Sequence, residues 1–227
     1  MFLAFDTATP AVTIAVCSAD ATGQTTVHAA TDTVDARRHG ELLAPGIRAT
    51  VDRAGITLAD VSRIVVGIGP GPFTGLRVGV AAAHALAQSL RVPCHGIPTL
   101  DAIAAAADRS GPFLVASDAR RKEVFWARYS DPYTRAGDIA VSPPDEAAAA
   151  AAGLPVLGHG AALYPQELGE SGQEPEPLYP SAAALCTLAA RALAADEPLA
   201  EAHPLYLRRP DAQRPGAPKR VAQWRQS

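Results

Sequence analysis

The apolar positions of the first hundred residues alternate between short runs and segments with helical spacing. Short apolar runs bounded by turn residues predict buried strands. They lie at residues 1–6, 11–18, 25–31, 63–68 and 92–97. Two segments with helical spacing predict helices over 39–54 and 74–90, and Gly55 can end the first of them.

The same alternation resumes after Pro98, where Thr99 is a candidate cap for a helix through Ala107. Further strands are expected at 113–119, 123–130 and 139–142, and alanine-rich helices at 144–152 and 181–195. Two successive halves of this kind predict a duplicated α/β fold. We expect residues 1–98 to form an N-terminal half, 99–208 a C-terminal half, and 209–227 a basic, flexible tail.

Composition narrows the class of protein. Of 227 residues, 48% are hydrophobic and 19% charged, and the net charge is −3, so no global basic field attracts nucleic acid. The N-terminus lacks a signal-peptide pattern, and no apolar run would span a bilayer. Cys17, Cys94 and Cys186 are odd in number and scattered, as expected of reduced thiols. These features predict a cytoplasmic protein without membrane contact.

A glycine-rich turn at residues 67–77 joins an expected strand to an expected helix. A phosphate cradle works by aiming backbone N–H groups at the anion, and Pro70 and Pro72 have none. No Lys-Ser or Lys-Thr follows Gly75, so the P-loop pattern fails as well. The turn therefore predicts a stiff connection that fixes a helix N-terminus, with Thr74 as the expected cap.

Small residues recur at every fourth position of the helix after this turn: Gly75, Gly79, Ala83 and Ala87. An apolar flank runs beside them, formed by Val78, Ala82, Leu86 and Leu90. A row of small side chains lets another backbone approach closely. That backbone can belong to the sheet of this chain or to a partner protein, and spacing alone does not choose between them.

Asp6 ends the first expected strand and is followed by Thr7 and Ala8. Actin-like ATPases place a metal-bound phosphate at such a position, which makes a nucleotide or anion site at Asp6, Thr7, Gly71 and Thr74 one interpretation. The turn after Asp6 has Ala8 where such sites usually have a glycine. A structural Asp that closes the turn through its side chain is the other interpretation.

Other chemistry has little support in the sequence. No two histidines have zinc-ligand spacing, no Cys-x-x-Cys occurs, and no nucleophile elbow is present, so we expect neither a metal site nor a catalytic residue. Arg77 opposes the helix dipole in a first turn, which predicts pairing with a carboxylate or a phosphate. The basic residues after position 208 are compatible with RNA contact or with a solubilising end.

Five motifs occur in an order known from one protein family. They are Leu3-Ala-Phe-Asp-Thr7, Arg38-His-Gly-Glu-Leu-Leu43, Gly69-Pro-Gly-Pro-Phe-Thr-Gly-Leu-Arg-Val-Gly-Val80, Asp118-Ala-Arg-Arg-Lys-Glu-Val124 and Pro204-Leu-Tyr-Leu-Arg208. Together they resemble the TsaB (YeaZ) family, accessory subunits of bacterial tRNA threonylcarbamoyladenosine synthesis. The resemblance implies an actin-like ATPase (ASKHA) fold of two related RNase H-like halves with mixed central sheets.

The resemblance also implies a function without catalysis by this chain. Members bind and order the catalytic subunit TsaD, the ATPase TsaE joins the assembly, and a homodimer can form when TsaD is absent. Contact with tRNA arises only through the complex. No cofactor is expected on this chain alone, whereas ATP or ADP can bind within the complex. The implied partner interface comprises His39, Leu42, Leu43, Ile47, Gly75, Arg77, Val78, Gly79, Ala82, Ala83 and Leu86.

Two positions depart from the family pattern. Pro72 replaces a common serine, which further weakens a nucleotide site beside the glycine-rich turn, and His84 replaces a frequent lysine. An older family label, M22 glycopeptidase, predicts a peptidase, but the sequence offers neither metal ligands nor a nucleophile. The alternative function is an ATP-dependent small-molecule kinase of the same fold, which Asp6 leaves open and which Ala8, Pro70 and Pro72 disfavour.

Overall fold

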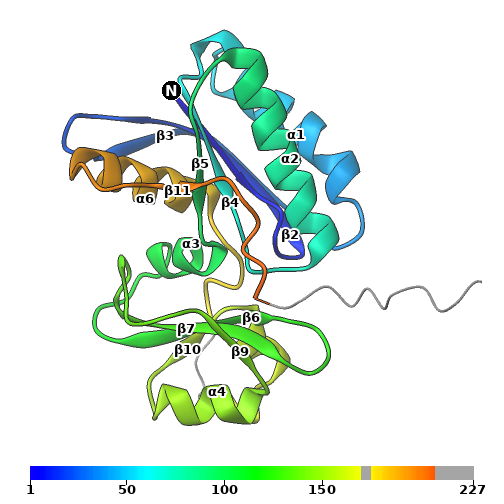
Figure 1. Ribbon diagram of the computed structural model, residues 1–227, viewed down its shortest axis with the longest axis vertical. Coiled ribbons are helices and arrows are strands. Elements are labelled where there is room, and N and C mark those ends of the chain that lie inside the picture. Colours follow the sequence, from blue (N-terminus) through cyan, green and yellow to red (C-terminus); the bar gives the residue numbers. More distant parts are fainter. Residues whose placement is uncertain (170–174, 208–227) are drawn as a thin grey trace, which may run out of the picture.

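The first of two sheets is built mainly from the N-terminal part of the chain. The computed structural model describes residues 1–169 and 175–207 (Figure 1). Six strands lie in the order β11-β5-β4-β1-β2-β3. Their bounds are Phe2–Asp6 (β1), Ala11–Ala19 (β2), Thr25–Val34 (β3), Arg63–Gly67 (β4), Cys94–Ile97 (β5) and Ala200–Glu201 (β11). Strands β1, β2 and β3 pair antiparallel, whereas β4 and β5 run parallel to β1, so the sheet is mixed.

Helices cover both faces of this sheet. Helices α1 (His39–Arg53) and α2 (Phe73–Leu90) lie side by side on one face, with a 3-10 turn, η1 (Leu58–Asp60), between them in sequence (Figure 1). Their buried side chains join those of the strands in one core. Helix α6 (Ala182–Ala194) packs on the opposite face through a second core that includes Leu185 and Cys186.

The second sheet is smaller. Strands β10 (Val156–Leu157), β6 (Phe113–Asp118), β7 (Val124–Asp131) and β8 (Thr134–Arg135) lie in that order, and β9 (Ala140–Ser142) pairs with β7. Strand β10 runs parallel to β6 and the other pairs are antiparallel, so this sheet is also mixed. Helix α3 (Thr99–Ala105) packs on one face, and α4 (Pro144–Ala151) and α5 (His159–Leu163) pack on the other.

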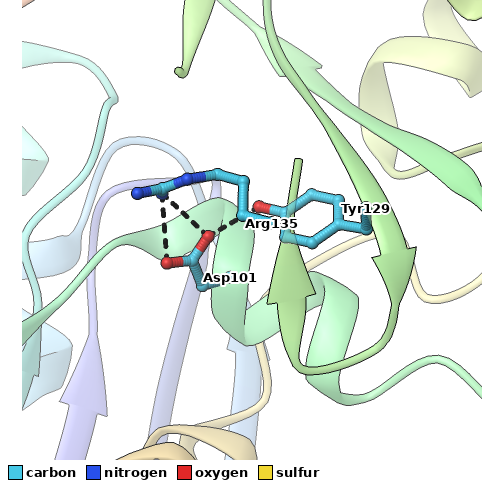
Figure 2. A network of polar contacts seen from close by, with 3 residues as sticks. All are labelled: Asp101, Tyr129 and Arg135. Carbon is cyan, nitrogen blue, oxygen red and sulfur yellow. Dashed lines mark hydrogen bonds and ion pairs between the residues drawn. The ribbon is translucent and has the colours of Figure 1, made fainter. Parts of the chain in front are cut away.

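A polar network fixes α3 to the second sheet (Figure 2). The Tyr129 hydroxyl donates to Asp101 Oδ1 at 2.7 Å, and Arg135 Nη1 lies 2.9 Å and 3.1 Å from the two carboxylate oxygens. Burial raises the pKa of Asp101, while the bonds from Tyr129 and Arg135 oppose that rise. One carboxylate thus holds α3, β7 and β8 together.

The predicted fold class is confirmed. The two halves, however, are not two continuous stretches of the chain divided after Pro98, as we expected. Helix α6 and strand β11 belong to the first sheet, although we expected them in the 99–208 half. The apolar face of α6 needs a sheet face to cover it, and the sequence does not say which sheet offers one. The expected tail, 209–227, lies outside the described residues.

Two predicted caps are wrong. Helix α2 begins at Phe73 after Pro72, and no side chain caps it, so Thr74 lies inside the first turn. Helix α3 begins at Thr99 itself, whose hydroxyl bonds to Asp6 instead of capping. Within the described ranges, no helix has both the length and the apolar character needed to cross a membrane.

Candidate functional site

An apolar groove runs along the outer surface between α1 and α2. Its volume is about 690 Å³, large enough to accept several side chains of a partner. Leu43, Ile47 and Val51 form one wall, Val78, Ala82, Ala85 and Leu86 form the other, and Ile56 and Leu58 close one end. A concave, mainly apolar groove of this volume is a candidate site of interaction.

Some of the predicted interface residues line the groove and others lie outside it. Leu43, Ile47, Val78, Ala82 and Leu86 line the groove. Leu42 is partly buried against the core beside the groove. His39 lies at the start of α1, where its Nε2 is 2.7 Å from the Thr9 carbonyl oxygen, so it holds the helix to the β1–β2 turn.

The row of small residues on α2 faces inward. A Cβ built on Gly75 would collide with the Thr7 carbonyl oxygen, and one on Gly79 would collide with the Thr7 hydroxyl. Ala83 and Ala87 are buried in the same core. The placement of Gly75, Gly79 and Ala83 at a partner interface is therefore wrong. These small side chains let α2 lie close to the sheet of its own chain.

Arg77 has aromatic partners within the described fold. Its Nε donates to the Tyr206 hydroxyl at 2.9 Å, and its guanidinium carbon lies 5.5 Å and 5.7 Å from the ring centres of Phe73 and Tyr206. A cation over ring faces is favourable, as is the charged hydrogen bond. Among the described residues, Arg77 thus pairs with aromatic side chains and not with a carboxylate. Contact of Arg77 with a partner remains a prediction.

Asp6 is fully buried where β1 meets the second half of the chain. Its carboxylate accepts hydrogen bonds from the Ala8 N–H and the Thr99 hydroxyl, both at 2.6 Å. The Thr99 hydroxyl in turn accepts from the Gly69 N–H at 3.0 Å. A Cβ on Gly67 would collide with the carboxylate, so the neighbouring strand also packs against it. This geometry favours the structural interpretation of Asp6.

The other members of the candidate anion site are also used internally. The Thr7 hydroxyl donates to the Gly75 carbonyl at 2.7 Å. A Cβ on Gly71 would collide with the Ala8 carbonyl, so this turn packs directly on the turn after β1. Thr74 alone of the four is exposed. In the part of the chain that the structure describes, no three His, Cys, Asp or Glu side chains group as metal ligands.

We expect Asp6 to make stability depend on pH. Burial raises its pKa to about 6, against the hydrogen bonds from Thr99 and Ala8, which lower it. The folded state then binds the proton more tightly than the unfolded state. The contribution of Asp6 to the free energy of unfolding should therefore be largest below about pH 4, fall between pH 4 and 6, and stay constant above, a change of about 3 kcal/mol.

Denaturant unfolding of Asp6→Asn and wild type between pH 4 and 7 measures this contribution. The variant loses an acceptor for Thr99 at every pH, so it should be less stable at pH 4. Its stability relative to wild type should then improve as the pH rises towards 7. A difference between the two proteins that stays constant across this range would contradict the assignment.

A left-handed hairpin tip connects β6 and β7. Arg120, Arg121 and Lys122 have φ values of 61°, 56° and 59°. Such a conformation costs a residue other than glycine on the order of 1 kcal/mol or more. The sequence shows the charges of this tip but does not predict its backbone conformation.

Three residues that line the groove were not predicted from the sequence. They are Ile56, Leu58 and Ala85, although Ala85 continues the helical spacing of Val78 and Ala82.

Comparisons with known proteins agree on one family. Residues 20–212 match the model of TsaD, the tRNA N6-adenosine threonylcarbamoyltransferase family. An uncharacterized protein of Mycobacterium tuberculosis is 43% identical over 213 residues, 92% of each chain. The tRNA threonylcarbamoyladenosine biosynthesis protein TsaB of Escherichia coli is 35% identical over 130 residues, 56% of this chain and 54% of that protein.

A solved structure extends the match over the whole fold. YeaZ from Pseudomonas aeruginosa superposes with a TM-score of 0.74 at 32% identity, covering 91% of this chain and 99% of that one. The chain therefore belongs to the TsaD family and, within it, to the TsaB (YeaZ) branch.

Proposed function

We propose that this chain is a non-catalytic subunit of tRNA N6-threonylcarbamoyladenosine synthesis. It binds the catalytic subunit TsaD through the groove between α1 and α2. Binding orders TsaD, which transfers the threonylcarbamoyl group to the adenosine next to the anticodon. The observation that carries the proposal is the groove itself, apolar and flanked by two long helices.

The character of the groove supports a protein partner. Side chains from both helices converge on it, including Leu43 and Ile47 from α1 and Val78 and Leu86 from α2. An apolar groove between two helices accepts a helix of a partner, whose side chains fill the spaces between the rows. Burying this surface would supply the free energy of association.

The surroundings of Asp6 support a role without catalysis. An actin-like ATPase needs a carboxylate that can reach a metal-bound phosphate. Asp6 is 0% exposed and its oxygens accept from Ala8 and Thr99. A carboxylate held in this way supports the fold, and we therefore disfavour the kinase alternative.

The remaining partners are those that the family resemblance implies. The E. coli relative is a tRNA threonylcarbamoyladenosine biosynthesis protein. We infer that TsaE joins the complex of this chain with TsaD, that adenine nucleotide binds within the complex, and that tRNA is engaged only by the assembly. Without TsaD, a second copy of the chain would cover the groove as a homodimer, in the cytoplasm.

Hydrogen exchange of the chain, alone and with its cognate TsaD, tests the proposal. Exchange of the amides in α1 and α2 should slow when TsaD binds, because the complex suppresses local opening of these helices. Helices α4 and α6, which pack on other faces, serve as internal controls and should be unchanged. Absence of binding, or protection confined to the second sheet, would contradict the proposal.

A further inference from the structure

The hairpin tip between β6 and β7 projects three consecutive cations. Arg120, Arg121 and Lys122 are all exposed, and each has a left-handed backbone. Bulky residues avoid this conformation, and strain of this kind concentrates at functional sites. A tip that served only to turn the chain would be better formed by glycine or asparagine.

One acid of this hairpin, Asp118, lies beneath the cations. Asp118 accepts from the Arg120 N–H at 2.7 Å and pairs with the Arg120 guanidinium at 3.3 Å. The side chain of Asp118 is 13% exposed, whereas that of Arg120 is 60% exposed. The carboxylate thus holds the tip in shape, and the outward surface of the tip is cationic.

A small pocket of mixed polar and apolar lining adjoins the tip and reaches into the first half. Its volume is about 260 Å³, which accommodates a phosphate group. Arg37 and Arg120 line it from the two halves, together with Thr9 and Thr74. Among the described residues that line it there is no carboxylate. Arginine recognises phosphate oxygens through paired N–H donors, and threonine hydroxyls donate to them as well.

We propose that the tip and this pocket bind the phosphodiester backbone of RNA. The inference rests on the proposed function, in which the assembly acts on tRNA, and it assigns a surface of this chain to that substrate.

RNA suits this surface better than an acidic protein does. The cations occur as a short row on one rigid turn, and a nucleic-acid strand presents its phosphates as a regular row. The chain as a whole carries a net charge of −3, so attraction of a polyanion depends on this local cluster. Contacts of this kind position RNA without reading its sequence.

The test compares charge reversal at the tip with matched reversal elsewhere. Fluorescence anisotropy measures the affinity of a labelled tRNA transcript for the full chain with TsaD, over a series of salt concentrations. Arg121→Glu/Lys122→Glu should weaken binding at least about tenfold at low salt and lower the salt slope by about one to two. The control, Arg91→Glu/Arg128→Glu, makes the same change in net charge at two other exposed arginines.

A glycine variant separates a binding role from a structural one. Arg121→Gly/Lys122→Gly removes both side chains and relieves the strain of the left-handed backbone. The variant should unfold at the same or a higher temperature than wild type. It should bind the transcript more weakly than wild type but less weakly than the reversal variant, which adds repulsion of the phosphates. A tip with only a structural role would change stability and leave the RNA affinity and the salt slope unchanged.

The same variants keep this inference separate from the proposed function. Complex formation with TsaD is measured by light scattering, and tip variants should retain it. Equal RNA affinity for the tip and control variants would overturn the inference. Weaker TsaD binding with unchanged RNA affinity would also overturn it, because the tip would then belong to a protein interface. If wild type fails to bind TsaD, the proposed function fails, and anisotropy of the chain alone still tests the tip.

Discussion

Replacing Gly79 by leucine is expected to destabilise the first half of the molecule strongly. A Cβ at this position would already collide with the hydroxyl of Thr7. Thr7 cannot move aside without breaking its 2.7 Å hydrogen bond to Gly75. The leucine would have to displace α2 from the sheet, so we expect a loss of at least about 3 kcal/mol in the free energy of unfolding, measured by denaturant titration.

An adjacent position gives the control for this prediction. Ala81 lies on the exposed side of the same helix. Ala81→Leu should therefore change the free energy of unfolding by no more than about 0.5 kcal/mol. A Gly79→Leu protein as stable as wild type would show that α2 does not lie against the sheet as described. The inward position of the small row, and with it the orientation of the groove, would then be wrong.

Much of the fold could be predicted because its signals are local. Apolar runs and helical spacing located strands β1 to β7 and β9 and the helices α1, α2 and α6 to within a few residues. The two-residue strands β8, β10 and β11 were missed, because so short a segment shows no periodicity. The motifs identified the family, and its mixed two-sheet fold is the one observed. The sheet to which α6 and β11 return was not predictable, because an apolar helix face fits any uncovered sheet.

In the candidate site, too, the sequence predicted only what local signals determine. Helical spacing identified two neighbouring stripes on α2, and the sequence could not say which one faces the sheet, because small residues suit close packing in either place. The role of Asp6 depends on Thr99, a residue 93 positions away. Arg77 contacts an aromatic residue, Tyr206, that is 129 positions away. Contacts this distant arise from the topology and leave no local pattern.

Replacing Ala82 by aspartate is expected to remove TsaD binding while preserving the fold. Ala82 is partly buried in the wall of the groove between Val78 and Leu86. A carboxylate there would lose its water when a partner covers the groove, and its short side chain cannot reach solvent. We expect the affinity for TsaD to fall at least about 100-fold, which corresponds to about 3 kcal/mol.

Equilibrium binding of TsaD to wild type, Ala82→Asp and Ala81→Asp is the measurement that tests the central claim most directly. The two variants introduce the same charge at consecutive positions of α2, one in the groove and one on the exposed face. Both should unfold at temperatures close to that of wild type. The account predicts that Ala81→Asp binds TsaD like wild type and that Ala82→Asp does not. Equal affinities for the two folded variants would contradict the assignment of the groove as the TsaD-binding surface.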